Sequence, residues 1–222
     1  MHGMTTMGVK RMPPVLIGAG IGAVAVALLL LVGLAVDRWP FGFDRAIILG
    51  LRAWHGPDWL PDAARDVTAL GSATVLTSIV LAVTGLLLVT RHRLTALALG
   101  AAATSGSWAV TLLKGHVARA RPTIVPHWAV VNHESFPSGH ATSSAVIYLT
   151  LAALGGLVVR DRAARAYLLG VAILLVGAIG ISRVYLGVHW PSDVLAGWSF
   201  GTLWAIGWWR ATASLRTSFA RE

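Results

Sequence analysis

Long runs of apolar residues, separated by short polar connections, dominate the chain. Six of these runs are long enough to form a helix across a hydrocarbon core of about 30 Å, at a rise of about 1.5 Å per residue. They cover residues 15–36, 72–90, 94–113, 139–159, 166–183 and 191–209. Neither the alternation typical of strands nor a longer internal repeat is present. We therefore predict an all-α, polytopic membrane protein, in which six transmembrane helices form one bundle and residues 1–222 form one domain.

The segment 39–70, between the first two runs, is too polar to cross a membrane. Apolar side chains nevertheless recur there at helical spacing, between charged ones, at Phe43, Ile47, Ile48, Leu51 and Trp54. This pattern predicts a helix that lies in the membrane interface. Such a helix either guides a lipid sideways towards a site or only covers the bundle, and the pattern leaves both interpretations open.

The composition agrees with a membrane protein and excludes several kinds of site. Hydrophobic residues make up 56% of the chain and charged residues only 12%, whereas roughly 25% of the residues of a soluble domain are charged. The absence of cysteine excludes disulfides, thiol nucleophiles and thiolate metal ligands. The formal net charge of +9 is interpreted as basic loops beside a membrane, and we expect no nucleic-acid partner.

The basic residues also predict which side of the membrane each loop occupies. With the N-terminus in the cytoplasm, the inner side carries ten Lys and Arg residues and two acidic ones. The outer side then carries eight basic and seven acidic residues. Because every short inner connection is basic, we predict that both termini are cytoplasmic. The chain would lie in the plasma or inner membrane, with its outer loops on the periplasmic or extracellular face.

Three basic residues stand near the ends of predicted spans on the outer face: Lys114, Arg121 and Arg183. Cations that converge beside a membrane repel one another unless an anion lies between them. Two guanidinium groups and an ammonium group suit a phosphate, because the planar fork of arginine binds two oxygens at once. Taken singly, each of these residues could instead extend its charge to lipid headgroups.

The sequence Pro-Ser-Gly-His at 137–140 opens the fourth predicted span on the same face. Ser138 is a natural N-cap, and Gly139 lets the backbone approach a ligand closely. The free amides and the positive end of the helix would then face an anion. N-caps are common, so this element supports an anion site only in combination with the nearby cations.

His189 and Asp193 lie four residues apart at the start of the sixth run, where Pro191 favours a first helical turn. The carboxylate can accept a hydrogen bond from one ring nitrogen and leave the other free to attack phosphorus. His140, at the neighbouring helix start, can protonate a leaving oxygen. Alone, an aspartate at a helix N-terminus often only complements the helix dipole. Together with the cations, these residues form a complete set for phosphoryl transfer.

At these residues the chain resembles the type-2 phosphatidic acid phosphatases, also called lipid phosphate phosphatases. The signature of that family has three parts: Lys-x6-Arg-Pro, Pro-Ser-Gly-His and Ser-Arg-x5-His-x3-Asp. They stand here at 114–122, 137–140 and 182–193, in order and without departure. The chain looks like the bacterial membrane-bound members, which act on phosphatidylglycerophosphate or undecaprenyl diphosphate.

The resemblance implies catalytic roles for three residues. His189 would be the nucleophile that forms a phosphohistidine, and Asp193 would be its partner. His140 would act first as the general acid for the leaving group and then as the base that activates water.

The resemblance also implies which residues bind the substrate phosphate: Lys114, Arg121, Ser138, Gly139 and Arg183. Members of the family need no metal and no other cofactor, which agrees with a site whose charge comes from three cations. Five further loop residues are expected to line the rim and to tune substrate choice: His116, Arg119, His127, His133 and Glu134.

The sequence thus predicts metal-independent hydrolysis of a phosphomonoester or diphosphate on a membrane lipid. Candidate substrates are undecaprenyl diphosphate, phosphatidylglycerophosphate, phosphatidic acid and a lipid A phosphate. The alternative is a non-catalytic phospholipid-binding or transport protein with the same pocket, although the presence of both histidines favours catalysis. Vanadium haloperoxidases have a similar anion site but are soluble, so six spans argue against that activity. The sequence leaves the oligomeric state open.

Overall fold

The fold was obtained as a computed structural model, which describes residues 20, 24, 27–28, 31–35, 41–54 and 56–219. Within these residues the secondary structure is entirely helical, as predicted. The elements in chain order are α2 (Gly42–Ala53), α3 (Leu60–Ala69), α4 (Ala73–Val89), α5 (Arg93–Val117), α6 (Gly139–Ser144), the π-helical turn η1 (Ala145–Leu149), α7 (Thr150–Gly155), α8 (Arg162–Tyr185) and α9 (Pro191–Phe219).

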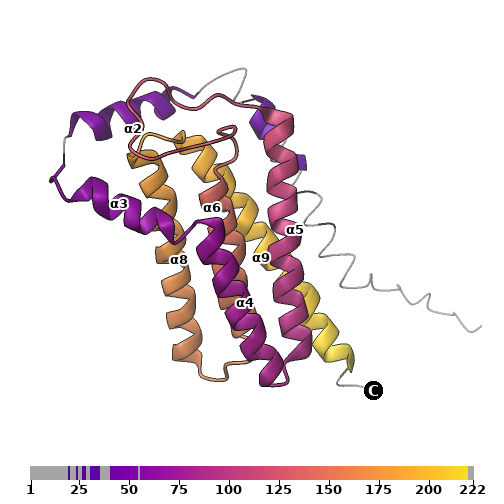
Figure 1. Ribbon diagram of the computed structural model, residues 1–222. Helices are drawn as coiled ribbons and strands as arrows, with labels where there is room; N and C mark the ends of the chain where they lie inside the picture. The colour runs from indigo at the N-terminus through magenta and orange to yellow at the C-terminus, as the bar shows by residue number, and fades with distance from the viewer. Residues whose placement is uncertain are drawn as a thin grey trace, which may run out of the picture.

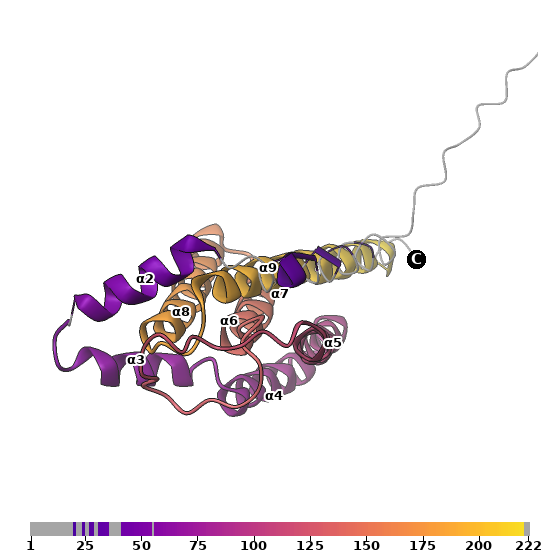
Figure 2. The ribbon, with the colours of Figure 1, turned by 90° about the horizontal axis from the view of Figure 1, so that it is seen from above.

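The long helices run side by side as a bundle, with the continuous helix made by α6, η1 and α7 at its centre (Figure 1, Figure 2). This central helix packs against α4, α5, α8 and α9. The main apolar core lies between them and includes Val110, Val146, Ile179 and Phe200. The helices α2 and α3 and the loop 118–138 lie across one end of the bundle, named here the loop end (Figure 1). The opposite end, where α4 turns into α5 and α7 into α8, is named the turn end.

Five of the six predicted spans correspond to helices of the bundle, namely α4, α5, the central helix, α8 and α9. The first predicted span, 15–36, lies mostly outside the described residues. By length and apolar composition, α5 and α8 can each cross a membrane, and α3 with α4 makes a third span if the 44° bend between them is included. In the described part of the chain, this criterion is therefore met by two or three helices rather than by six.

Several helix ends differ from the predicted ones. The helix α8 starts at Arg162 instead of 166, because the carboxylate of Asp161 accepts a hydrogen bond from the amide of Ala164 (2.7 Å) and caps the helix. The central helix ends at Gly155, earlier than predicted. The helix α9 continues to Phe219, since no proline or glycine interrupts its polar last turns.

Glycines allow α8 and α9 to lie very close to their neighbours. A Cβ atom at Gly201 on α9 would lie 2.4 Å from the Cβ of Ala145 and 2.8 Å from the amide nitrogen of Val146. A Cβ atom at Gly180 on α8 would lie 2.4 Å from the indole ring of Trp198 on α9. The contact at Gly201 falls on the π-helical turn, which the sequence pattern did not predict.

The segment 39–70 forms two helices, α2 and α3, where one was predicted. On α2, Ile48 is buried while Ile47 is exposed, and Trp54, which follows the helix, is exposed as well. Asp44, one of the charged residues between the apolar ones, is also buried, with only 1% of its surface exposed. Its burial follows from a contact with the site at the loop end, described below.

Candidate active site

The three sequence motifs meet at the loop end of the bundle. The first motif forms the last turn of α5 and the loop that follows, the second begins α6, and the third joins the end of α8 to the start of α9. The amide of Ser138 donates a hydrogen bond to the carbonyl of Asp193 (3.1 Å), which ties the second motif to the third. Arg121 of the first motif donates to the carbonyl of Val188 (2.7 Å). The fold therefore brings all three motifs together.

His189 is buried, with 2% of its surface exposed, in the connection between α8 and α9. Its Nε2 lies 3.1 Å from Nη1 of Arg121. Because a guanidinium group only donates, Nε2 must accept and carries no proton. The proton is then on Nδ1, which lies 3.5 Å from Oδ2 of Asp193 and 3.4 Å from Oγ of Ser135. The ring is thus held as the tautomer whose lone pair is on Nε2, where Arg121 donates to it.

The pKa of His189 is lowered to about 3, chiefly because the ring is buried. Hydrogen bonding to Asp193 and its negative charge act against this shift, while the positive charges of Arg121 and Arg183 add to it. The imidazole is therefore neutral at physiological pH. A neutral ring whose Nε2 carries no proton is the form that can act as a nucleophile once Arg121 moves away.

Asp193 is fully buried, and both of its carboxylate oxygens accept hydrogen bonds. Oδ1 accepts from Nη1 of Arg119 (2.6 Å). Oδ2 accepts from the hydroxyl of Ser135 (2.5 Å) and from the amide of Trp190 (2.9 Å). These donors fix the carboxylate in place, so that it can orient the ring of His189 from the Nδ1 side.

Arg119, which was predicted to line the rim, is buried with 5% of its surface exposed. Its guanidinium group bridges two buried carboxylates, donating from Nη1 to Asp193 (2.6 Å) and from Nη2 to Asp44 on α2 (2.9 Å). Asp44 also accepts from the amide (2.8 Å) and the hydroxyl (2.6 Å) of Ser192. The rim prediction for Arg119 is wrong, because two buried carboxylates require a buried cation between them.

Lys114 and Arg121 converge on one backbone carbonyl. Nζ of Lys114 donates to the carbonyl of Glu134 (2.7 Å), and Nη2 of Arg121 donates to the same oxygen (3.3 Å). Arg121 also donates from Nε to the carbonyl of His133 and from Nη2 to that of Asn132, each at 3.0 Å. Cations bind an anion more strongly than a neutral carbonyl. A phosphate at this place can therefore replace some of these bonds.

Arg183 and Ser138 carry buried donors without a partner among the described residues. Nη1 of Arg183 donates to the hydroxyl of Thr68 on α3 (3.1 Å), but its Nε is unpaired. Ser138 occupies the N-cap position of α6, yet its hydroxyl makes no capping hydrogen bond and is unpaired as well. A Cβ atom at Gly139 would lie 3.6 Å from Cε of Lys114, which places the ammonium side chain beside this helix start. Buried donors of this kind are costly unless a ligand accepts from them.

His140 lies in the first turn of α6 and is half-buried. It is within electrostatic range of Lys114, Arg121 and Arg183. It also lies against the turn between α3 and α4, where a Cβ atom at Gly71 would be 3.4 Å from its Cβ and Cδ2. Its ring makes no hydrogen bond with any described residue. Both nitrogens are therefore available to a substrate or to water.

The other four residues predicted at the rim remain near the surface. His116, His127 and His133 are exposed, and Glu134 is partly buried. Glu134 contributes to the site through its carbonyl, which accepts from both Lys114 and Arg121. An influence of these side chains on substrate choice stays a prediction.

The donor set of the site suits an anion. Within the described residues, no three His, Asp or Glu side chains form a group that could hold a metal ion. Both oxygens of Asp193 are already engaged by Arg119, Ser135 and Trp190. In the described part of the chain, the unpaired groups at the site are Nε of Arg183 and the hydroxyl of Ser138, and Lys114 and Arg121 lie beside them. Such donors bind phosphate oxygens rather than metal ions.

The sequence interpretation missed three side chains of the site: Asp44, Ser135 and Ser192. Ser192 lies next to Asp193 in the third motif, and that position was the one available signal. Asp44 gave no signal, because a charged residue on an amphipathic helix is expected to face water. Ser135 gave no signal either, because a loop sequence does not show which of its side chains point into the site.

The chain is similar to known proteins over the region that holds the three motifs. A family model described as the PAP2 superfamily matches residues 94–216, more than half of the chain and all three motifs. Phosphatidylglycerophosphatase B of Bacillus subtilis is 38% identical over 100 residues, which make up 41% of this chain and 45% of that protein. The chain thus spans less than half of the length of this relative. Decaprenylphosphoryl-5-phosphoribose phosphatase of Mycolicibacterium smegmatis is 30% identical over 161 residues, or 71% of this chain and 82% of that protein.

The fold has a counterpart among solved structures. The crystal structure of a transmembrane PAP2-type phosphatidylglycerolphosphate phosphatase from Bacillus subtilis matches with a TM-score of 0.69 at 23% identity, over 95% of this chain and 97% of that one. At this identity the match concerns the fold alone. The resemblance first seen in the three motifs is confirmed by the family model and by the relatives, and the chain belongs to the PAP2 superfamily.

Proposed function

We propose that this protein hydrolyses a phosphomonoester or diphosphate on a membrane lipid, through a phosphohistidine formed on His189. The observation that carries the proposal is a buried, neutral imidazole that lies close to the buried, unpaired donors of Arg183 and Ser138. Phosphoryl transfer requires such a pair of features, a nucleophile and fixed donors for the phosphate oxygens.

In the first step, Nε2 of His189 attacks the phosphorus atom. The N–P bond forms while the bond from phosphorus to the leaving oxygen breaks, and His140 donates a proton to that oxygen. The ring of His189 becomes positive as the bond forms. Asp193 stabilises this charge from the Nδ1 side.

The phosphate oxygens would be held by the predicted binding set: Lys114, Arg121, Ser138, Gly139 and Arg183. Without substrate, Arg121 covers Nε2 of the nucleophile at 3.1 Å. An incoming phosphate is a stronger acceptor and takes this donor. Phosphate binding and exposure of the nucleophile are therefore coupled in a single movement of Arg121.

In the second step, His140 removes a proton from a water molecule, which attacks the phosphorus of the phosphohistidine. The N–P bond breaks, inorganic phosphate leaves, and His189 returns to its neutral form. His140 then holds the proton that the next leaving group needs. This cycle requires no metal ion, so we expect full activity in the presence of a chelator.

A groove beside the site supports a lipid as the substrate. It has a volume of about 250 Å³ and is lined mainly by apolar residues of α9, Phe41 and the N-terminal segment, and it includes Ser192, the neighbour of Asp193. Part of an acyl or prenyl chain fits such a groove while the phosphate reaches His189. The names of the two relatives, a phosphatidylglycerophosphatase and a decaprenylphosphoryl-5-phosphoribose phosphatase, support the same substrate class.

We further propose that the loop end faces the periplasm or the cell exterior, with both termini in the cytoplasm. An even number of spans, such as the predicted six, places both termini on the same side of the membrane. The helix α2 would then lie in the interface of the outer leaflet. The five long helices of the bundle and the basic turn end support it.

The proposal is tested with protein purified in detergent and a panel of four substrates: undecaprenyl diphosphate, phosphatidylglycerophosphate, phosphatidic acid and a lipid A phosphate. Release of phosphate from at least one of them is expected. His189→Ala should lower kcat by roughly three orders of magnitude or more, because the nucleophile is removed. His92→Ala serves as the matched control, since His92 precedes α5 at the turn end, away from the three motifs, and its replacement should leave kcat nearly unchanged.

The alternative, a non-catalytic phospholipid-binding or transport protein, predicts another result. Lipid phosphates would then bind without release of phosphate, and His189→Ala would leave binding unchanged. Retention of near-full phosphatase activity by His189→Ala would refute the phosphohistidine mechanism itself.

A further inference from the structure

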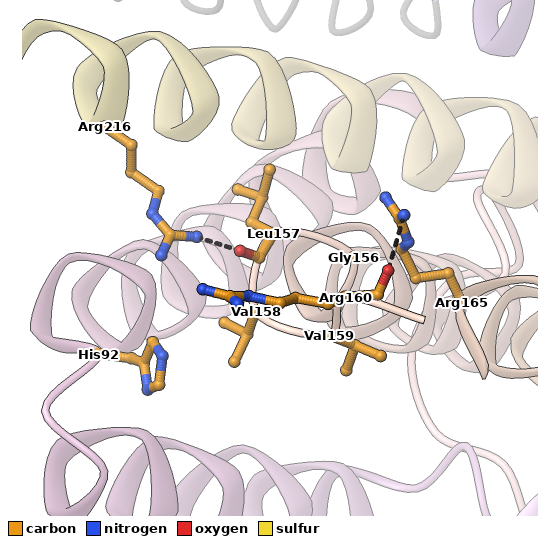
Figure 3. Close-up of a pocket in the computed structure, with 8 residues that line it drawn as sticks. All are labelled: His92, Gly156, Leu157, Val158, Val159, Arg160, Arg165 and Arg216. Carbon is orange, nitrogen blue, oxygen red and sulfur yellow. Dashed lines mark hydrogen bonds between the residues drawn. The ribbon is translucent and has the colours of Figure 1, made fainter. Parts of the chain in front are cut away.

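A second group of cations surrounds a hollow at the turn end of the bundle (Figure 3). The hollow has a volume of about 440 Å³. It lies between the start of α5, the connection from α7 to α8 and the end of α9. Its walls carry the side chains of His92, Arg160, Arg165 and Arg216, together with residues 156–159.

Two of the three arginines, Arg165 and Arg216, are held by backbone carbonyls, and all three keep N–H groups to spare. Nη1 of Arg216 donates to the carbonyl of Leu157 (2.6 Å), and Nη2 of Arg165 donates to the carbonyl of Arg160 (3.1 Å), as the dashed lines in Figure 3 show. The guanidinium group of Arg160 makes no hydrogen bond with any described residue, and it points to the side of the hollow where Arg216 and His92 lie (Figure 3). The hollow thus contains a preformed set of donors with unused capacity.

No carboxylate in the described part of the chain lines the hollow. Asp161, the acidic residue of this connection, directs its carboxylate to the amide of Ala164 (2.7 Å) at the start of α8. The positive charges of the three arginines are therefore not balanced inside the hollow. Cations in this arrangement favour the entry of an anion.

The hollow and the catalytic site lie at opposite ends of the same helices. The helix α8 carries Arg165 near its start and Arg183 in its last turn, and α9 carries Asp193 in its first turn and Arg216 in its last. The helix between Arg165 and Arg183 is about 27 Å long at about 1.5 Å per residue. This length is close to the thickness of a hydrocarbon core, about 30 Å. When the catalytic site lies at one headgroup layer, the hollow therefore lies at the other.

We propose that this hollow binds a phosphate group, and that the phosphate is that of an anionic phospholipid in the leaflet opposite the catalytic site. Guanidinium groups bind phosphate oxygens in the forked geometry that Arg160 and Arg216 can offer. Basic pockets between helices at a membrane surface are known sites for acidic headgroups. A zwitterionic headgroup would add its own cation to the cluster and binds less well. Free inorganic phosphate offers the same chemistry, and the experiment separates the two sources.

The test compares two double variants of the protein in a neutral detergent. Each variant loses two positive charges. R160Q/R216Q removes two cations of the hollow. R93Q/R210Q removes two exposed arginines that do not line it and serves as the matched control. Each protein is titrated with dioctanoyl phosphatidylglycerol, dioctanoyl phosphatidylcholine and inorganic phosphate by microscale thermophoresis. The catalytic end has the same cations in both variants, so binding there cannot separate them.

We expect the Kd for dioctanoyl phosphatidylglycerol to rise about tenfold or more in R160Q/R216Q and to stay unchanged in R93Q/R210Q. Dioctanoyl phosphatidylcholine should bind the unmodified protein more weakly. Because Arg216 also holds the carbonyl of Leu157, its replacement can disturb the fold. The single variant Arg160→Gln avoids this problem and should raise the Kd about fivefold without a change in Tm.

Two results would overturn the proposal. Equal affinity of both double variants and of Arg160→Gln for every ligand would show that the hollow binds no phosphate. If only the affinity for inorganic phosphate depended on Arg160 and Arg216, the hollow would be a site for free phosphate and the assignment to a lipid headgroup would be wrong.

Discussion

The ring of His189 lies between a cation on one side and a carboxylate on the other. Arg121 at Nε2 and Asp193 at Nδ1 fix which nitrogen carries the proton. Burial keeps the ring neutral even though the carboxylate favours a positive charge. In the proposed mechanism, the carboxylate stabilises the ring only when the N–P bond forms and the ring acquires that charge. A group that is neutral before the reaction and stabilised during it suits the nucleophile role proposed for His189.

This state of His189 predicts how stability depends on pH. Between pH 6.5 and about 3 the unfolded chain binds a proton at His189 and the folded chain does not, since burial lowers the pKa of this ring to about 3. Stability should therefore rise with pH in this window and fall on acidification, with a slope of at most about 1.4 kcal/mol per pH unit. The measurement is Tm in detergent between pH 5 and 7 for the unmodified protein and for His189→Gln.

His189→Gln should show a shallower dependence of Tm on pH, because the titrating group is removed. Identical slopes for the two proteins would contradict a depressed pKa of His189. The variant His133→Gln is the control, since His133 is exposed and its carbonyl contact with Arg121 does not need the ring.

At the scale of helices, α2 is tied to the catalytic connection by a chain of buried polar contacts. Asp44 on α2 binds Arg119 and Ser192, and Arg119 in turn binds Asp193. The position of Asp193 thus depends on a helix that contributes no residue to the three motifs. The segment 39–70 therefore has a structural role at the site. This role is independent of whether the segment also guides a lipid towards the site or only covers the bundle.

Removal of Asp44 should therefore impair catalysis from a distance. Asp44→Ala leaves Nη2 of Arg119 without its buried acceptor, while Nη1 still donates to Asp193. We expect a loss of about 1–3 kcal/mol in stability together with a lower kcat. Asp44→Asn can still accept from Ser192 and should be affected less. The control is Arg45→Ala, an exposed neighbour on the same helix. Measurement of kcat and Tm for the three variants checks this prediction, and an unchanged kcat for Asp44→Ala would contradict the link.

The close contact of α9 with the central helix makes a second prediction at this scale. Gly201→Ala would place a Cβ atom 2.4 Å from Ala145 and 2.8 Å from the backbone of Val146. Since backbone atoms cannot move aside, we expect a loss of roughly 1–3 kcal/mol, seen as a lower Tm. Gly177→Ala on α8 is the control, because no atom lies within 4 Å of its Cβ position. A Tm that falls equally in both variants would mean that the contact at Gly201 is unimportant.

At the scale of the whole molecule, cations gather at both ends of one bundle. Those of the loop end face the proposed catalytic histidine, and those of the turn end surround the hollow at Arg160 and Arg216. The same long helices fix the separation between the two groups. Under the two proposals made above, one fold holds an anion at each surface of the membrane.

The orientation of the bundle can be tested directly, because the chain contains no cysteine. His133→Cys introduces a thiol in the exposed loop of the loop end, and Ala163→Cys introduces one in the exposed start of α8. In intact cells, a membrane-impermeant maleimide should label position 133 and not position 163. Both positions should react after permeabilisation, which controls for access. Labelling of 163 alone in intact cells would reverse the proposed topology.

The sequence alone determined the helical class, the approximate limits of five bundle helices and the residues of the three motifs. Apolar runs must be helical in a membrane, because no water is present to pair with the backbone. The spacing of the three motifs predicted that Lys114, Arg121 and Arg183 converge near His189, and the structure brings Arg121 and Arg183 within electrostatic range of that ring. The helical class, the helix limits and the motif residues depend on the local order of residues, so the sequence is enough to predict them.

Only the tertiary structure decided the burial of Arg119 and Asp44, the unpaired donors of Arg183 and Ser138, and the hollow at the turn end. Each of these features joins segments that are far apart in the chain, such as Asp44 and Arg119, which are 75 residues apart. Whether a charge is buried depends on which other segment covers it and whether that segment brings an opposite charge. No local pattern carries this information, because the free energy of a buried ion pair depends on both partners at once.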